Sequence, residues 1–219
     1  MTKEEYVKKM SAQKDWAPGW DAIEAEFSRL YPKQDPMHYG TSLTSRAQFG
    51  GKEYLDGYSV YRSPRGYFHI VTFGMSELYC DPGSFGNEFS GWGYEMTMKL
   101  KAESPEDCLW AINMMGGLAR YTNKSGDYFE AGEFFAGNGK PLHAGTGSKI
   151  TGLVIASDTS AKAQDTVHGK VEFLQLVGIT AKEAAALKAG TIDAGELLAL
   201  MERNDPELVT DMQRETSYI

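Results

Sequence analysis

The sequence contains few cysteines, and they are not arranged as in a disulfide-stabilised or zinc-stabilised fold. Cys80 and Cys108 are the only two among 219 residues, and neither belongs to a Cys-x-x-Cys motif or a cysteine–histidine cluster. A chain of this length needs neither kind of support, since it buries roughly 70% of its unfolded surface. Sparse cysteine is typical of a reducing compartment, so we expect both thiols to be free.

The sequence also lacks long basic or apolar runs. Its longest basic run is the pair Lys8–Lys9, and 22 Lys and Arg against 30 Asp and Glu give a net charge of −8. Phosphate backbones and anionic membranes bind basic surfaces, so we expect neither nucleic acid nor a membrane as a partner. No run approaches the roughly 18 apolar residues of a membrane span, and residues 1–14 have no signal-peptide core. We therefore expect a soluble, cytoplasmic protein.

Aromatic residues are scarce toward the C-terminus. Of the 26 Phe, Trp and Tyr residues, 24 lie between Tyr6 and Phe135, which leaves Phe173 and Tyr218 in the last 84 residues. Two domains would explain this distribution, and so would one domain with an aromatic body and an aliphatic end. No low-complexity linker interrupts the chain, which favours one domain. Most rings are expected in the core, although tyrosines around glycine-rich loops can also form a protein-binding surface.

The hydrophobic pattern predicts alternating groups of helices and strands. Apolar residues at three- and four-residue spacing indicate helices, whereas alternating aromatic and β-branched residues indicate strands. Ser104 followed by Pro105 is typical of a helix start, and Leu109 opens the predicted buried face. Gly116 and Gly117 inside this helix predict close packing against another backbone. The expected elements are a loosely attached helix at 2–14, helices at 19–31, 104–121, 180–188 and 193–201, strands at 54–61, 67–73, 93–101, 152–156 and 171–177, and an edge strand at 133–136.

The sequence contains few motifs that would indicate a catalytic, metal-binding or phosphate-binding site. Residues Gly145–Lys149 resemble a phosphate loop, but the spacing differs and the segment leads into a strand, so we interpret it as a turn. The histidines are isolated from one another, which gives no zinc-ligand spacing; they are His38, His69, His143 and His168. His69 lies in an apolar strand, where a hydrogen-bonded structural role is favoured over that of a catalytic base. We expect no metal and no cofactor.

Glu77 and Asp81 are the remaining acidic candidates. They lie four residues apart after a predicted strand, at the start of a glycine-rich loop. Two carboxylates at this spacing could bind a metal or act as an acid–base pair, and they could equally be solvated side chains. No Gly-x-Ser-x-Gly nucleophile motif accompanies them. A hydrolase that uses Glu77 and Asp81 is therefore kept only as the enzymatic alternative.

A series of short motifs in a fixed order resembles the suppressor of fused family. The central motif is Val71–Asp81, with the sequence VTFGMSELYCD. Each motif is short, but their order between residues 19 and 215 is specific, and on this ground the chain is identified as a member of the family. The other motifs are Arg29–Pro32, Tyr58–Ser63, His69, Gly91–Thr97, Leu118–Tyr121, Glu172–Ile179 and Thr210–Met212.

The resemblance implies a fold and a role. The fold is α+β, a single domain with a mixed β-sheet and helices packed on both faces, over residues 19–219, after an N-terminal helical extension at 1–18. The role is protein binding without catalysis. Animal members restrain Gli-type transcription factors by pairing an extended peptide with sheet edges and gripping it between two domains. Many single-domain bacterial members are thought to be immunity proteins that neutralise toxins encoded beside them.

The resemblance also implies partner-binding residues in one loop. Asp81 matches the acidic position associated with partner binding in animal members, and Glu77 and Tyr79 are added because they share its loop. Ile70 and Cys80 replace the aromatic residue and the glycine expected at those positions. The second domain of the animal clamp also lies outside this sequence. A bacterial immunity role is therefore favoured over a Gli-type partner.

We expect a protein partner of one of two kinds. A basic toxin domain would be attracted by the net charge of −8, and an extended peptide of a transcription factor would pair with a sheet edge. We expect the chain itself to be a monomer or a weak homodimer. A purely structural, self-assembling protein is a further alternative, and it would need a large symmetric interface.

Overall fold

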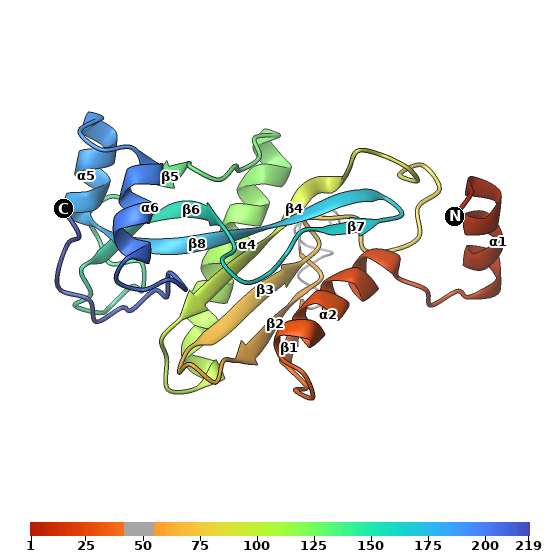
Figure 1. The fold of residues 1–219 in the computed structure, drawn as a ribbon, viewed down its shortest axis with the longest axis horizontal. Helices are drawn as coiled ribbons and strands as arrows, with labels where there is room; N and C mark the ends of the chain where they lie inside the picture. The colour runs from red at the N-terminus through yellow and green to blue at the C-terminus, as the bar shows by residue number, and fades with distance from the viewer. Residues whose placement is uncertain (42–54) are drawn as a thin grey trace.

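The computed structural model describes residues 1–41 and 55–219. The expected helices and strands appear in the expected order, and the strand predicted at 54–61 begins at Gly57, with Tyr54 outside the described residues. The elements are α1 (Lys3–Ala12), α2 (Pro18–Leu30), β1 (Met37–Gly40), β2 (Gly57–Arg62), β3 (Phe68–Phe73), β4 (Phe89–Leu100), a 3₁₀ helix η2 (Pro105–Cys108), α4 (Leu109–Ser125), β5 (Phe134–Phe135), β6 (Ile150–Ser157), β7 (Gln164–Thr166), β8 (Gly169–Thr180), α5 (Ala181–Ala189) and α6 (Ala194–Glu202) (Figure 1).

The strands form one mixed sheet of eight strands. Its order is β1-β2-β3-β4-β8-β6-β5, and β7 pairs with β8 beside this path. The two twelve-residue strands β4 and β8 lie next to each other and run parallel, whereas the other strand pairs are antiparallel. The short β5 lies at one end of the sheet, as predicted for 133–136.

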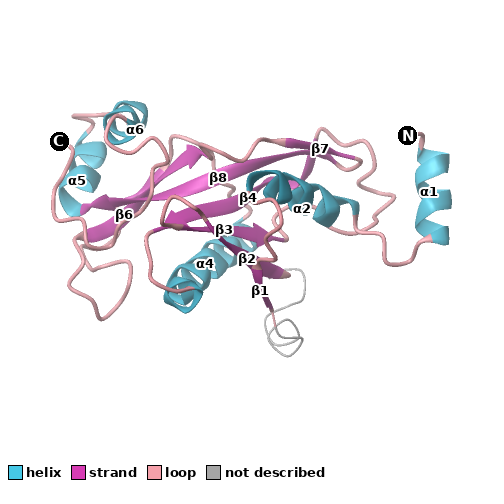
Figure 2. Cartoon of the chain, turned by 60° about the horizontal axis from the view of Figure 1, so that its bottom comes forward, coloured by secondary structure: helices cyan, strands magenta, loops and turns pink. Residues whose placement is uncertain are grey.

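Helices cover both faces of the sheet, as expected for this α+β fold (Figure 2). Side chains alternate between the faces along each strand, so Leu174 and Leu176 of β8 pack with α4, while Phe173 packs with α2 on the opposite face. Val177 lies on the same face as Phe173 and packs against α5 and α6. The aromatic and aliphatic parts of the chain therefore cover different regions of one sheet, which confirms the prediction of a single domain.

The helix predicted to begin at Ser104 starts with one turn of 3₁₀ helix. Ser104 and Asp107 form a capping box there, and the α-helix proper begins at Leu109. With 3.6 residues per turn, Leu109 lies at the edge of the arc formed by the buried Ala111, Met115 and Ala119 of α4. The predicted position of Leu109 on the buried face was wrong: the residue is 41% exposed.

The two glycines of α4 have different surroundings. A Cβ atom at Gly116 would lie 2.6 Å from the Tyr58 hydroxyl, whereas a Cβ at Gly117 would meet nothing within 4 Å. Of the two glycines predicted to pack closely, only Gly116 does so. Its neighbour is the side chain of the buried Tyr58, so the prediction that it packs against another backbone was wrong.

The C-terminal segment is tied to the centre of the sheet. Thr210 pairs with Leu100 at the end of β4, and its hydroxyl accepts a hydrogen bond from the Gly178 N–H at 2.8 Å. Arg214 donates to the Glu183 carboxylate and to the Gly178 carbonyl. Glu183 is fully buried; burial opposes its ionisation, but Arg214 and two backbone N–H groups hold its pKa below the ordinary value.

Both cysteines are free thiols, as predicted. Cys108 is buried beneath the start of α4, and burial raises its pKa to about 12, which makes it a poor nucleophile. Among the described residues, no helix combines the length and the apolar content needed to cross a membrane; the longest, α4, has 17 residues.

Candidate partner-binding site

The loop between β3 and β4, residues 74–88, carries Glu77, Tyr79 and Asp81. Its first turn is organised by Glu95 of β4, which is fully buried. One oxygen of this carboxylate accepts from the Ser76 hydroxyl at 2.6 Å and from the Gly74 N–H at 3.0 Å. Burial raises the pKa of Glu95, and the surrounding hydrogen-bond donors oppose that rise. The start of the loop is thus shaped by a buried acceptor of the next strand.

The middle of the loop rests on the first turn of α2. The N–H of Gly19 donates to the Leu78 carbonyl at 3.1 Å, which satisfies one of the free N–H groups of the helix terminus. A Cβ atom at Gly19 would lie 2.0 Å from the Glu77 carbonyl oxygen, so only glycine allows this approach. The loop and α2 are therefore packed backbone to backbone.

Asp81 closes a turn within the loop. Its carboxylate accepts from the Ser84 hydroxyl at 2.6 Å and from the Gly83 N–H at 2.9 Å. These two hydrogen bonds lower the pKa of Asp81, which keeps the side chain ionised at neutral pH. Tyr79, two residues earlier, is 50% exposed. The loop thus presents an aromatic ring and a fixed negative charge close together in the sequence.

His168 connects this loop to the turn between β7 and β8. Its Nδ1 atom lies 3.3 Å from the Glu77 carbonyl oxygen, although 91 residues separate the two. Burial lowers the pKa of His168, and the charges of Glu77 and Asp81 oppose that shift. The structure therefore places the backbone of Glu77 against His168, a residue predicted from the sequence to be isolated from the other histidines.

The N-terminal helix is part of the same cluster. Tyr6 of α1 is completely buried, and its hydroxyl lies 2.9 Å from the Nε2 atom of His168. Its ring contacts Phe85 of the loop and Trp16, and Cys80 donates to the Trp16 carbonyl at 3.1 Å. The prediction of a loosely attached helix was wrong, because Tyr6 fixes α1 to the loop. Burial raises the pKa of Tyr6 to about 12.

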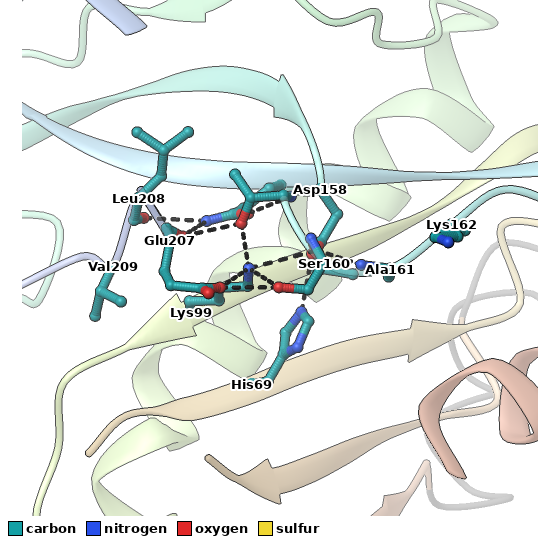
Figure 3. A network of polar contacts seen from close by, with 12 residues as sticks. His69, Lys99, Asp158, Ser160, Ala161, Lys162, Glu207, Leu208 and Val209 are labelled. Carbon is teal, nitrogen blue, oxygen red and sulfur yellow. Dashed lines mark hydrogen bonds and ion pairs between the residues drawn. The ribbon is translucent and has the colours of Figure 1, made fainter. Parts of the chain in front are cut away.

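His69 belongs to a different polar cluster, on the face of the sheet that α2 covers (Figure 3). Its Nδ1 atom lies 2.8 Å from the Tyr31 hydroxyl, and its Nε2 atom lies 2.9 Å from Asp158. Lys99 reaches Glu207 at 2.8 Å and lies 3.6 Å from Asp158. His69 and Lys99 are fully buried. Burial opposes the ionisation of Asp158, but these two neighbours outweigh it and hold its pKa well below the ordinary value.

The hydrogen bonds of this second cluster indicate a structural role. It joins β3 and β4 to the segments that follow β6 and α6, and the structural role predicted for His69 agrees with its two hydrogen bonds. Within the described ranges, no three His, Cys, Asp or Glu side chains are grouped as a metal site requires.

Sequence reasoning missed three residues that build the loop site: Tyr6, Glu95 and His168. Tyr6 lies in a charged, helix-permissive segment, and Glu95 alternates with apolar residues like a solvent-facing strand residue. His168 lies in a short turn between strands. Each one acts through contacts with residues far away in the sequence, so local spacing carries no signal for them.

Comparison with known proteins identifies relatives over most of the chain. Residues 51–215 match the suppressor of fused protein (SUFU) family profile. The suppressor of fused homologues of Homo sapiens and Mus musculus are each 33% identical to this chain over 215 residues. The alignment covers 90% of this chain and 43% of each homologue, so the chain spans less than half the length of these relatives.

Solved structures share the fold. A chain in the crystal structure of a Sufu–Fu complex superposes with a TM-score of 0.79 at 26% identity, covering 92% of this chain and 93% of that one. Drosophila Suppressor of Fused gives 0.79 at 27% identity, covering 92% and 51%. A SUFU homologue from Neisseria gonorrhoeae has the same fold at 17% identity, with a TM-score of 0.62 and coverage of 92% and 97%. The chain belongs to the suppressor of fused family.

Proposed function

We propose that this chain is a non-catalytic protein-binding module that holds its partner at the loop of residues 74–88. The observation that carries the proposal is the construction of this loop: Glu95 shapes its start, and Tyr6 and His168 support its middle. A loop ordered before binding loses little conformational entropy when a partner docks. The presence of a family member in a Sufu–Fu complex supports the same role.

The loop offers the chemistry that protein interfaces use. Tyrosine is enriched at binding hot spots because its ring adds contact area and its hydroxyl remains polar. Tyr79 supplies such a ring, half exposed, and Asp81 supplies a charge whose direction is fixed by Gly83 and Ser84. Glu77 adds a second carboxylate in the same loop. These three residues are the partner contacts that we propose.

We further propose that the partner is basic and that the chain acts as a bacterial-type immunity protein in the cytoplasm. The net charge of −8 favours encounter with a basic protein such as a toxin domain that acts on nucleic acid. The family resemblance supplies the immunity role. A regulator that binds an extended peptide of a transcription factor is the alternative, and the short strands β1 and β5 at the two ends of the sheet would suit it.

A hydrolytic role for Glu77 and Asp81 has weaker support. A general acid needs a raised pKa, whereas hydrogen bonds lower the pKa of Asp81. His69, which would complete such a site, is hydrogen-bonded to Tyr31 and Asp158 in the other cluster. Turnover that is lost in Asp81→Asn while partner binding persists would favour the enzyme over the binding module.

Co-expression with the products of neighbouring genes tests the proposal. The chain is expected to retain one of them through purification and to sediment alone as a monomer or weak homodimer. Tyr79→Ala and Asp81→Asn should each weaken the complex, because they remove a proposed contact. Leu109→Ala is the matched control, since it removes an exposed apolar side chain at the start of α4. Equal binding by all three variants would overturn the proposed site.

A further inference from the structure

Two hollows flank Tyr128 and Phe129 in the connection between α4 and β5. One has a volume of about 670 Å³ and extends to the first residues of β4. The other has a volume of about 440 Å³ and extends from Tyr121 of α4 to β5. Tyr128 and Phe129 line both hollows. We call the two hollows and the connection between them the Tyr128 surface.

Exposed aromatic rings on this surface are supported by a buried one. Tyr128 is 55% exposed and Tyr121 is 50% exposed, whereas Phe129 is buried. Phe129 stacks on Tyr121 with their ring centroids 6.1 Å apart and their planes at 10°. Phe135 meets the edge of Phe129 at 5.2 Å. The Tyr121 ring is thus held against the core by Phe129, and both tyrosines remain open to solvent.

The charged residues that line the two hollows are all acidic. Glu130 and Glu172 line the larger hollow, and Asp127 and Glu133 line the smaller one. No lysine, arginine or histidine is among the described residues that line either hollow. Lys170 pairs with Glu172, so the uncompensated charge is concentrated on the connection itself, at residues 127–133.

Hydrogen bonds fix the connection in this shape. The Tyr121 hydroxyl donates to Asp127 at 2.8 Å, and the Glu130 N–H donates to the Glu133 carboxylate at 2.9 Å. Backbone bonds of 2.8 Å join Gly132 and Glu133 to Ile155 of β6. A ligand would therefore meet a surface that is already ordered, and the entropic cost of binding would be small.

We propose that the Tyr128 surface binds arginine and lysine side chains of a basic protein segment. A guanidinium group stacks on a tyrosine ring through cation–π attraction and pairs with a carboxylate through paired N–H donors. Tyr128 beside Glu130 offers both kinds of contact. This proposal rests on the proposed function, because the basic segment is taken to belong to the protein partner that the chain binds.

The test uses a fluorescein-labelled peptide of nine arginines, titrated with the full chain at physiological salt and followed by anisotropy. Tyr128→Ala should weaken binding about two- to fivefold, the value of an exposed cation–π contact, while Tyr128→Phe should keep most of the affinity because its ring face remains. Glu130→Lys should weaken binding further. Glu202→Lys, on an exposed side chain of α6, carries the same change of net charge and should have a much smaller effect.

Three results would overturn the proposal: no binding of the peptide, equal losses in Glu130→Lys and Glu202→Lys, or amide NMR shifts confined to residues outside 89–94, 121–135 and 172–174. Equal losses would mean that the affinity for the peptide depends only on the net charge of the chain. If the co-expressed partner is retained but the arginine peptide is not bound, this inference fails and the proposed function stands. If the peptide binds at residues 121–135 but no partner is retained, the proposed function fails and the site stands.

Discussion

The Tyr6 hydroxyl lies 2.9 Å from the Nε2 atom of His168, and this contact joins residues that are 162 positions apart. The other ring nitrogen of His168 reaches the Glu77 carbonyl oxygen at 3.3 Å. One histidine therefore links the N-terminal helix, the β7–β8 turn and the loop that carries Asp81. The helix α1 is a structural support of the loop for this reason.

Replacing Tyr6 should loosen the loop. Tyr6→Phe removes one hydrogen bond and should lower the free energy of unfolding by about 0.5–1.5 kcal/mol. Tyr6→Ala also removes a fully buried ring, so α1 should detach and amide exchange in residues 79–88 should become faster. Hydrogen-exchange mass spectrometry measures this directly. Val7→Ala, at a partly exposed position of the same helix, should leave exchange in 79–88 unchanged; unchanged exchange in Tyr6→Ala would refute the support role.

Removing the carboxylate of Glu95 should destabilise the start of the same loop. Glu95→Ala leaves the Ser76 hydroxyl and the N–H groups of Gly74 and Ser76 without their acceptor. Each buried donor that loses its partner costs about 1–3 kcal/mol, so a loss of roughly 3 kcal/mol or more is expected in urea unfolding. Glu103→Ala, on an exposed side chain just after β4, is the control and should change stability little. A loss in Glu95→Ala no larger than this control would contradict the role.

Stability should fall between about pH 7.5 and pH 5.5. Burial lowers the pKa of His168, His69 and His38, so the unfolded chain binds more protons than the folded chain below the ordinary histidine pKa of about 6.5. The stabilisation is present above that pKa and is lost as the pH falls. His168→Gln removes one of these groups and should make the urea midpoint less pH-dependent. An unchanged or steeper pH dependence would show that His168 does not titrate in this way.

The adjacent glycines of α4 should respond differently to alanine. Gly117→Ala should stabilise the protein by about 1 kcal/mol, because alanine favours a helix and the added methyl meets open space. Gly116→Ala should be less stable than Gly117→Ala, because its methyl would lie 2.6 Å from the hydroxyl of the buried Tyr58. Thermal unfolding of the two variants makes the comparison, and equal stabilities would contradict the packing described for α4.

Much of the fold follows from local sequence patterns. Capping boxes at Thr180 and Asp193 mark the starts of α5 and α6, and the apolar run at 171–177 lies in the centre of the sheet. The resemblance of the short motifs to those of the family predicted the α+β fold class and the single domain. Leu109 was misplaced because it lies at the edge of the buried face of α4, where the spacing of apolar residues does not distinguish a covered position from an exposed one.

The site was less predictable than the fold. Asp81, Glu77 and Tyr79 were selected from one loop, and their role as partner contacts stays a prediction. Glu95 resembles any polar residue of an alternating strand, and only the folded chain shows that five hydroxyl and backbone donors converge on it. Tyr6 and His168 meet across 162 residues, and a single sequence contains no signal for such a contact.

A hydrogen-exchange footprint of the chain with its co-purified partner tests directly whether the loop of residues 74–88 holds that partner. We expect slower exchange in residues 74–88 of the complex than of the free chain, with exchange in α6 unchanged. Tyr79→Ala should reduce that protection together with the affinity. A complex of full affinity that protects other segments and leaves residues 74–88 exchanging as in the free chain would show that the partner binds elsewhere.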